Sequence, residues 1–390
     1  MVRNETSTHS GPHPARPLKA TGRLRVALVT EYYYPHFGGV TEHVQNLAVH
    51  LRAGGHFATV ITSRIPGHHH DAEGVHRVGR SLVLLSNGSF ARITAGLGLR
   101  RAIVRILRSE RIDVVHIHGP LAPTLGLVAQ DAARELGIPA VATFHSWFRR
   151  SVAYSILRSP LQRRLDQFAA RIAVSAPAIE ANRRYFRSDW EIIPNGVDVG
   201  YFHPNGRRPA DAAGDGPRLL FLGRLDPRNG LDQILSAMPR ILAALPNSKL
   251  VVAGDGPLRA VYERRARPLG KSLRFVGRVY DERPDLYTSA DLYLCPTDKA
   301  SFGITLLEAM ACGTPIIGSD ISGFRELVRD GKCLLVPPND PAAWADAVIR
   351  LIRDPARRAE MGAWGLEKAA QYSWAQVSAR VLEVYRRVTR

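Results

Sequence analysis

Short apolar runs and helical patterns alternate along the first half of the chain. Arg25–Thr30 has the pattern of a short buried strand, and apolar residues from Val40 to Leu51 recur at helical spacing. Gly54-Gly55 ends this helix, and the next strand is predicted at Ala58–Thr62. The same rhythm returns with a strand at 113–118, a helix at about 124–136 and a strand at 140–144.

A second series of the same kind follows, with a strand at 218–223, a helix near 231–245 and a strand at 249–253. Alternating units of this type build parallel sheets with helices on both faces. We therefore predict an α/β fold of two doubly wound, Rossmann-like domains with the site in the cleft between them. The Pro-, Gly-, Asp- and Ala-rich segment 205–217 separates the two series. The predicted organisation is a polar tail at 1–22, domains at 23–204 and 218–371, and a C-terminal helix at 372–390.

Composition excludes several classes of protein. The 390 residues exceed one ordinary domain, and 45% hydrophobic with 23% charged residues is typical of a globular chain. No apolar stretch approaches the ~20 residues of a membrane span, and the polar first residues do not resemble a secretory signal. Three cysteines, Cys295, Cys312 and Cys333, are too few for a disulfide framework. These features favour a cytoplasmic protein.

The charge is unusual, because 53 basic against 35 acidic residues give a net charge of +18. Only six of the basic residues are lysines, and such an arginine bias can reflect codon usage in a GC-rich genome. The placement is uneven, however, with sixteen arginines and six acidic residues between Arg92 and Arg187. No nucleic-acid-binding module accompanies this charge, so no nucleic-acid partner is predicted.

Candidate chemistry lies just after the predicted strands, where open parallel sheets bind their ligands. Gly38 and Gly39 directly precede a helix, where free backbone N–H groups can approach a phosphate. A plain tight turn explains the pair equally well, and the absence of G-x-G-x-x-G here argues against a dehydrogenase. Arg224 follows another strand and can either bind phosphate oxygens or pair with Asp226.

The most informative segment is 297–315, in which the small-residue loop Ser301–Gly303 runs into a helix that carries Glu308. A helix that begins this way directs free N–H groups at an anion. Glu308, one turn into the helix, can hold sugar hydroxyls, although an acid there can also simply favour the helix dipole.

Histidines lie on one predicted strand and at the end of the next. His145 lies at the end of the strand 140–144 and is a candidate hydrogen-bond partner or acid/base group, with a structural role equally open. His116 and His118 share one face of the preceding strand. No Asp, Glu or Cys nearby completes a convincing ligand set, so we predict a packed or hydrogen-bonded pair and no metal site.

Six segments, in order along the chain, resemble those of the retaining glycosyltransferases of family 4, which have the two-domain fold called GT-B. The matching segments are Phe37–His43, Asp113–Gly119, Ile193–Asp198, Leu222–Leu225, Ala253–Pro257 and Phe302–Met310. The ordered set is far more specific than any single motif and spans nearly the whole chain. Within the family, 142–146 and 322–326 are most similar to the phosphatidylinositol mannosyltransferases and related lipid mannosyltransferases.

The resemblance implies transfer of a hexose, with mannose favoured, from a nucleotide-diphosphate sugar such as GDP-mannose with retained anomeric configuration. It implies that Gly38 and Gly39 lie near the diphosphate and that Arg224 binds it. It also implies that His145 hydrogen-bonds the transferred sugar and that Glu308 holds the ribose. The amides that would face phosphate and sugar belong to Phe302, Gly303, Ile304 and Thr305. The scheme needs no metal or other cofactor.

Two positions depart from the family pattern. The family's common acidic pair is spaced Glu-x7-Glu, but Ala300 stands eight residues before Glu308. The lysine that usually follows the arginine loop is replaced by Asn229, and the adjacent Arg228 is the candidate substitute for its charge. We expect an altered donor preference rather than loss of activity.

The acceptor stays open at this point. The segment Trp147–Arg158 mixes aromatic, aliphatic and basic residues, as an interfacial helix on anionic lipid does, although a solvated basic face is the commoner origin of such a pattern. One hypothesis is therefore a transferase with a lipid-linked or glycan acceptor at the cytoplasmic membrane face. The alternatives are a soluble transferase for polysaccharide or small-molecule acceptors and a nucleotide-sugar-binding module without turnover.

Overall fold

A computed structural model describes residues 22–36, 38–67, 73–86, 89–121, 124–206, 216–328 and 332–390, with the side chains of 84–91 left out. The predicted tail, apart from residue 22, and residues 207–215 of the predicted linker lie outside the described residues. Phe37 and the three consecutive histidines at 68–70 also lie outside them.

The first half of the described chain folds around a parallel sheet of seven strands, in the order β3-β2-β1-β6-β7-β8-β9. The strands predicted at 25–30, 58–62, 113–118 and 140–144 are confirmed as β1, β2, β6 and β7. Their apolar side chains are buried on both faces, because helices cover both sides of the sheet. The strands are β1 (Arg25–Thr30), β2 (Phe57–Ser63), β3 (Val75–Val78), β6 (Val114–His118), β7 (Ala140–Phe144), β8 (Ala170–Ala173) and β9 (Glu191–Ile192).

Two apolar cores sandwich this sheet. On one face, α1 packs through Val44, Leu47 and Leu51, in agreement with the predicted helix. On the other face, α2, α3 and α5 supply the core around Ile103 and Leu165. The helices of this half are α1 (Gly39–Ala53), α2 (Leu99–Ser109), α3 (Leu125–Glu135), α4 (Val152–Ile156), α5 (Arg158–Asp166) and α6 (Ala176–Arg183).

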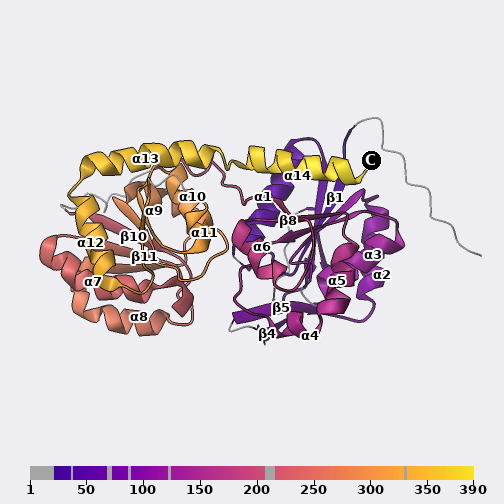
Figure 1. Ribbon diagram of the computed structural model, residues 1–390, viewed down its shortest axis with the longest axis horizontal. Coiled ribbons are helices and arrows are strands. Elements are labelled where there is room, and N and C mark those ends of the chain that lie inside the picture. The colour runs from indigo at the N-terminus through magenta and orange to yellow at the C-terminus, as the bar shows by residue number, and fades with distance from the viewer. Residues whose placement is uncertain are drawn as a thin grey trace, which may run out of the picture.

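Two features of this half differ from the regular alternation. An antiparallel hairpin of β4 (Arg80–Ser86) and β5 (Ser89–Ala95) stands apart from the main sheet, near α4 in Figure 1. The segment expected to form an interfacial helix begins its helix only at Val152. The Ser151 side chain accepts a hydrogen bond from the Tyr154 N–H at 3.2 Å, so Trp147 precedes the helix.

The second half repeats the plan with a parallel sheet of six strands in the order β12-β11-β10-β13-β14-β15. Its strands are β10 (Arg218–Leu222), β11 (Lys249–Ala253), β12 (Leu273–Gly277), β13 (Leu292–Cys295), β14 (Ile316–Ser319) and β15 (Leu334–Val336). Its helices are α7 (Leu231–Ala244), α8 (Arg259–Ala266), α9 (Arg283–Ser289), α10 (Ile304–Ala311), α11 (Ser322–Arg325) and α12 (Pro341–Ile352), with the 3₁₀ turns η2 (Pro227–Asn229) and η3 (Arg267–Ser272). Separate cores lie on its two faces, so the predicted pair of doubly wound α/β units is confirmed.

The last two helices run along one side of both halves in Figure 1. The first of them, α13 (Pro355–Ala370), packs on α10 of the second half. The other, α14 (Trp374–Val388), packs on α1 and buries Val381, Val384 and Tyr385 in the first half. A backbone bridge between Val197 and Ser373 lies where the chain passes between the halves.

Candidate active site

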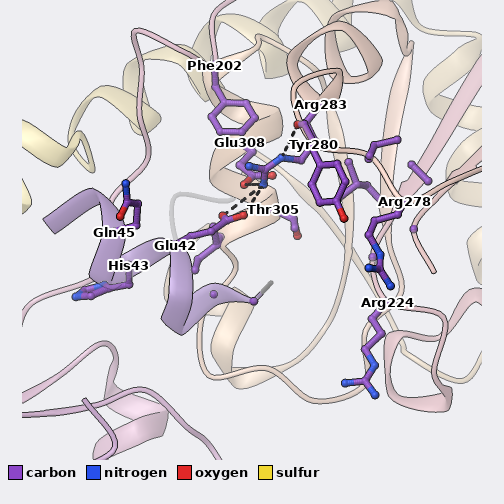
Figure 2. Close-up of a pocket in the computed structure, with 18 of the residues that line it drawn as sticks. Glu42, His43, Gln45, Phe202, Arg224, Arg278, Tyr280, Arg283, Thr305 and Glu308 are labelled. Atoms are coloured by element: carbon purple, nitrogen blue, oxygen red, sulfur yellow. Dashed lines mark hydrogen bonds and ion pairs between the residues drawn. The ribbon is translucent and has the colours of Figure 1, made fainter. Parts of the chain in front are cut away.

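A cleft of about 880 Å³ lies between the two halves. Its walls are the turn between β1 and α1, the loops after β10, β11 and β12, and the first turn of α10. These loops follow the carboxyl ends of parallel strands, which is where ligands bind in open α/β sheets. Figure 2 shows the cleft with charged side chains from both halves.

The glycine turn brings two helix starts together. Gly38 is the N-cap of α1, and no side chain caps the helix there. A Cβ atom on Gly39 would lie 3.0 Å from Ile304 Cδ1, at the first residue of α10. Gly38, Gly39, Ile304 and Thr305 all line the cleft. Two helix N-termini with free N–H groups therefore face one space, as an anion site requires.

Arg224 lies in the loop after β10 and lines the cleft. Its Nε is 3.7 Å from Asp226 Oδ2, so the predicted pairing with Asp226 is present, and its side chain is 49% exposed. An exposed pair of this type contributes only about 0–1 kcal/mol, which leaves the guanidinium available to a phosphate. Asn229 Nδ2 donates to the Arg224 carbonyl at 2.7 Å, so the asparagine that replaces the family's lysine holds this loop.

Arg278 and Arg283 are cleft cations that the sequence reasoning missed. Arg278 directly follows β12, and its Nη2 is 3.3 Å from Asp255 Oδ2. Arg224 was predicted because it follows a strand. Arg278 would have been predicted for the same reason if the strand 273–277 had been recognised in the sequence. Figure 2 shows Arg224 and Arg278 one below the other on the same side of the cleft.

Glu308 is buried, with 2% of its side chain exposed, and each of its carboxylate oxygens has a side-chain partner. Arg283 Nη1 lies 2.8 Å from Glu308 Oε1, and the Tyr287 hydroxyl donates to Oε2 at 2.9 Å. The same Arg283 Nη1 is 3.0 Å from Glu42 Oε1 on α1, so this arginine bridges the two halves (Figure 2). Burial raises the pKa of Glu308 to about 7, although Arg283 opposes the shift. Burial acts to lower the pKa of Arg283, but Glu308 and Glu42 outweigh it and hold that pKa above its ordinary value.

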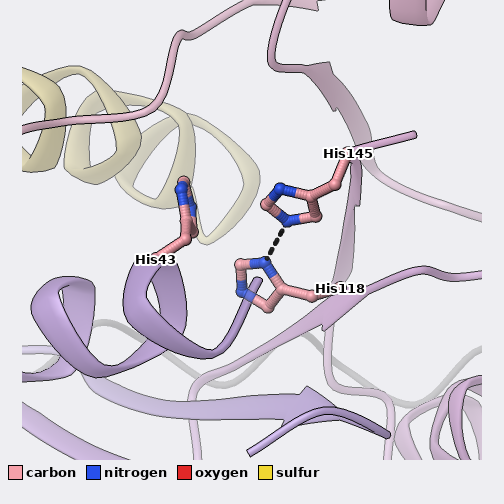
Figure 3. A group of neighbouring side chains, drawn as sticks. All are labelled: His43, His118 and His145. Atoms are coloured by element: carbon pink, nitrogen blue, oxygen red, sulfur yellow. Dashed lines mark hydrogen bonds between the residues drawn. The ribbon is translucent and has the colours of Figure 1, made fainter. Parts of the chain in front are cut away.

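A cluster of histidines adjoins the cleft (Figure 3). His118 Nδ1 and His145 Nε2 are 3.0 Å apart, and the ring of His43, from α1, lies 4.7 Å from that of His145. His116 packs on His118 with ring centroids 4.2 Å apart, so the predicted packed pair is confirmed. His116 is held by the Tyr385 hydroxyl and Thr143 Oγ1, each at 2.6 Å. The sequence reasoning missed His43 as a member, because it comes from a helix far away in the chain.

Four of the predicted site residues are not among those that line the cleft. Arg228 is exposed on the 3₁₀ turn η2 and does not line the cleft. Phe302 turns toward Tyr372, with ring centroids 6.0 Å apart, and Gly303 is the buried N-cap of α10. His145 packs against the cleft-lining His43, and its carbonyl accepts a 2.5 Å hydrogen bond from Ser301 Oγ across the two halves.

Comparison with known proteins covers both halves of the chain. The family model described as Glycosyltransferase Family 4 matches residues 37–201, and that of Glycosyl transferases group 1 matches residues 204–367. The phosphatidyl-myo-inositol mannosyltransferase of Mycolicibacterium smegmatis is 36% identical, with 94% of each chain covered. A GDP-mannose-dependent monoacylated alpha-(1-6)-phosphatidylinositol monomannoside mannosyltransferase of Corynebacterium glutamicum is 30% identical over 73% of this chain and 78% of its own.

Solved structures agree on the fold. A glycosyltransferase from Rickettsia africae superposes with a TM-score of 0.74 over 94% of this chain and 98% of its own, at 16% identity. The chain has two Rossmann-like units with a cleft at their strand ends. The two family models together span most of the chain. The chain belongs to glycosyltransferase family 4 and has the GT-B fold.

Proposed function

We propose that the protein transfers a mannosyl group from GDP-mannose to a phosphatidylinositol-type lipid, with retention of the anomeric configuration. The observation that carries this proposal is the cleft in which Arg224, Arg278 and the starts of α1 and α10 meet. Cations and free helix N–H groups are what a nucleotide diphosphate requires. The choice of donor and acceptor is supported by the names of the relatives at 30–36% identity.

In this proposal the protein lowers the barrier by stabilising the negative charge that develops on the departing diphosphate. Arg224 and the N–H groups of Ile304 and Thr305 bind the diphosphate. Glu308 accepts hydrogen bonds from the ribose hydroxyls, and His145 hydrogen-bonds the transferred sugar. Because Arg283 already occupies one Glu308 oxygen, the ribose shares this carboxylate with Arg283 or displaces it. The expectation that transfer needs no metal stays a prediction, and activity that survives prolonged treatment with EDTA is the result that supports it.

Two surfaces of the first half support a lipid acceptor. Helix α2 buries Leu99, Ile103 and Leu107 and exposes arginines that border a shallow groove. On α4, Val152 and Ile156 are more than 70% exposed, at 71% and 74%. An arginine-rich face and an exposed aliphatic pair are features of proteins that lie on anionic membranes. Within the described residues, no helix has the length and apolar character needed to cross a membrane.

The test is a transfer assay with the purified chain, phosphatidylinositol in mixed micelles, and a panel of nucleotide sugars. We expect a mannosylated lipid from GDP-mannose, with the α-configuration of the donor preserved in the product. Transfer to soluble glycans but not to lipid would contradict the acceptor. Tight donor binding without any hydrolysis or transfer would support a binding module instead.

A further inference from the structure

The histidine cluster beside the cleft has unused hydrogen-bonding capacity. His43 and His118 are buried, with 2% of each side chain exposed, and the Nε2 atom of each has no hydrogen-bond partner. Buried polar atoms are normally paired, so the orphaned His43 Nε2 beside the His118–His145 pair requires an explanation. Among the described residues, His43, His118 and His145 are the one group of three or more possible metal ligands, and one nitrogen from each lies within 4.8 Å of the others.

The protonation state of the rings suits a metal. His43 Nδ1 donates to the amide oxygen Asn195 Oδ1 at 2.9 Å, so the lone pair of the neutral ring is on Nε2, which has no partner. Burial lowers the pKa of His43 to about 4, and it holds the pKa values of His118 and His145 well below the ordinary range. A neutral imidazole nitrogen with a free lone pair is the form that binds metals.

We propose that His43, His118 and His145 form a binding site for a divalent transition metal of the Zn²⁺ type. The nitrogens now 3.0 Å apart, His118 Nδ1 and His145 Nε2, would both coordinate the ion, with His43 Nε2 as the third ligand. The hydrogen between the first two would move to the other nitrogen of its own ring, so that no proton is lost. A tetrahedral ion with Zn–N bonds of about 2.0–2.1 Å needs nitrogens about 3.4 Å apart, which small side-chain rotations provide.

The chemistry of the ligands selects the ion. Three neutral imidazoles suit Zn²⁺, Co²⁺, Ni²⁺ or Cu²⁺, whereas Mg²⁺ and Ca²⁺ prefer the carboxylate oxygens that this group lacks. The hydrogen bond from His43 to Asn195 is the outer contact that commonly orients a metal-binding histidine. His43 also lines the cleft, so a fourth coordination position can open toward the bound substrate.

The consequence for activity rests on the proposed function. If His145 hydrogen-bonds the transferred sugar, a metal on its Nε2 takes that nitrogen away from the substrate. The site is then inhibitory, so micromolar Zn²⁺ would slow transfer and a chelator would restore it.

The test measures metal binding without any substrate, so its result does not depend on the proposed activity. Residues 68–70 are three further histidines, and all proteins in the test carry serine there to remove a competing site. Addition of Co²⁺ alone should give the visible absorption of tetrahedral cobalt at one ion per chain, and Zn²⁺ should displace it. His43→Gln and His118→Gln should each weaken binding by at least about tenfold.

His50→Gln is the matched control, because His50 lies on the same helix and its ring is 6.1 Å from that of Trp374, which also packs against His43. Circular dichroism and melting curves confirm that each variant is folded. Undiminished one-to-one binding in His43→Gln, or no saturable binding in the parent protein, would overturn the proposal. Metal binding with no transferase activity would leave the site standing and refute the proposed function. Transferase activity with no metal binding would refute the metal site and leave the proposed function standing.

Discussion

Single residues decide how the cleft receives a donor, and Arg224 is the clearest case. Its neighbours already hold the loop in place, since Asn229 binds the Arg224 carbonyl and Asp226 lies 3.7 Å from the guanidinium. The loop backbone is therefore held before any ligand arrives, and the side chain is still half-exposed. Positioning of this kind reduces the entropy lost on binding.

We expect Arg224→Ala to weaken donor binding roughly ten- to hundredfold. A charge-assisted hydrogen bond to phosphate contributes about 1.5–3 kcal/mol. Isothermal titration with the nucleotide sugar measures the change. Arg228→Ala is the matched control, because Arg228 is exposed in the same loop and does not line the cleft. Equal losses in the two variants would mean that the charge of the loop, and not the position of Arg224, binds the donor.

We expect Glu308 to make donor binding dependent on pH. In the proposed function its carboxylate form accepts hydrogen bonds from ribose hydroxyls, and burial raises its pKa to about 7. Donor affinity should therefore fall as the pH decreases through 7, because protonation removes the acceptor. The contribution of Glu308 to folding stability depends on pH in the opposite direction. The unfolded carboxyl ionises near 4.5, so this residue contributes less to stability as the pH rises from 4.5 through about 7.

Titration of the donor dissociation constant between pH 5.5 and 8.5 checks the dependence on Glu308 (roughly one and a half pH units either side of 7). Glu308→Gln should remove the change in this range. Arg283→Met should move its midpoint upward, because Arg283 is the cation that favours the ionised form. A profile that is the same in all three proteins would assign the titration to another group.

At the scale of elements, α2 shows how a helix can serve the core and the surface at once. One face is buried in the core of the first half, and Arg101 and Arg105 are exposed on the other. Not every arginine between residues 92 and 187 is exposed in this way, since Arg164 pairs with Asp131 and Arg171 binds the Leu165 carbonyl. Part of the charge excess therefore stabilises the fold.

We expect the double substitution Arg101→Gln/Arg105→Gln to weaken binding to phosphatidylglycerol vesicles roughly thirtyfold at low salt, since each basic residue near such a surface contributes about 1 kcal/mol. Co-sedimentation measures the effect, and neutral vesicles should show little binding by any variant. The control is Arg264→Gln/Arg267→Gln, which removes two exposed charges from the second half. The membrane assignment fails if the parent protein does not distinguish anionic from neutral vesicles.

For the whole molecule, the C-terminal helix ties the end of the chain to the first half. Tyr385 is fully buried on α14, and its hydroxyl hydrogen-bonds His116 on β6 at 2.6 Å. Tyr385→Phe should leave His116 Nδ1 without a partner and cost about 1–3 kcal/mol of stability. A lower thermal midpoint is the expected result. Tyr372→Phe, at a half-buried tyrosine between α13 and α14, should change stability by less than about 0.5 kcal/mol.

Contacts across the cleft make the two halves one functional unit. Arg283 forms ion pairs with both Glu42 and Glu308, and the Ser301 hydroxyl donates a hydrogen bond to the His145 carbonyl. Each contact includes a residue for which we propose a role in substrate binding. A change in the spacing of the halves would therefore alter the donor site as well as the outer shape of the molecule.

The amino-acid sequence by itself determined the α/β class, most central strands and the family. Strands such as β1 and β7 are mostly apolar, and Gly39, Arg224 and Thr305 lie in the loops or first helical turns that follow strands, so local patterns suffice to find them. Only the tertiary structure decided which side chains meet. Arg283 reaches Glu42 across the cleft, and His43 joins His118 and His145, because α1 lies against residues far away in the chain. Periodicity reports which face of an element is buried, but the partner across that face depends on how the whole chain packs.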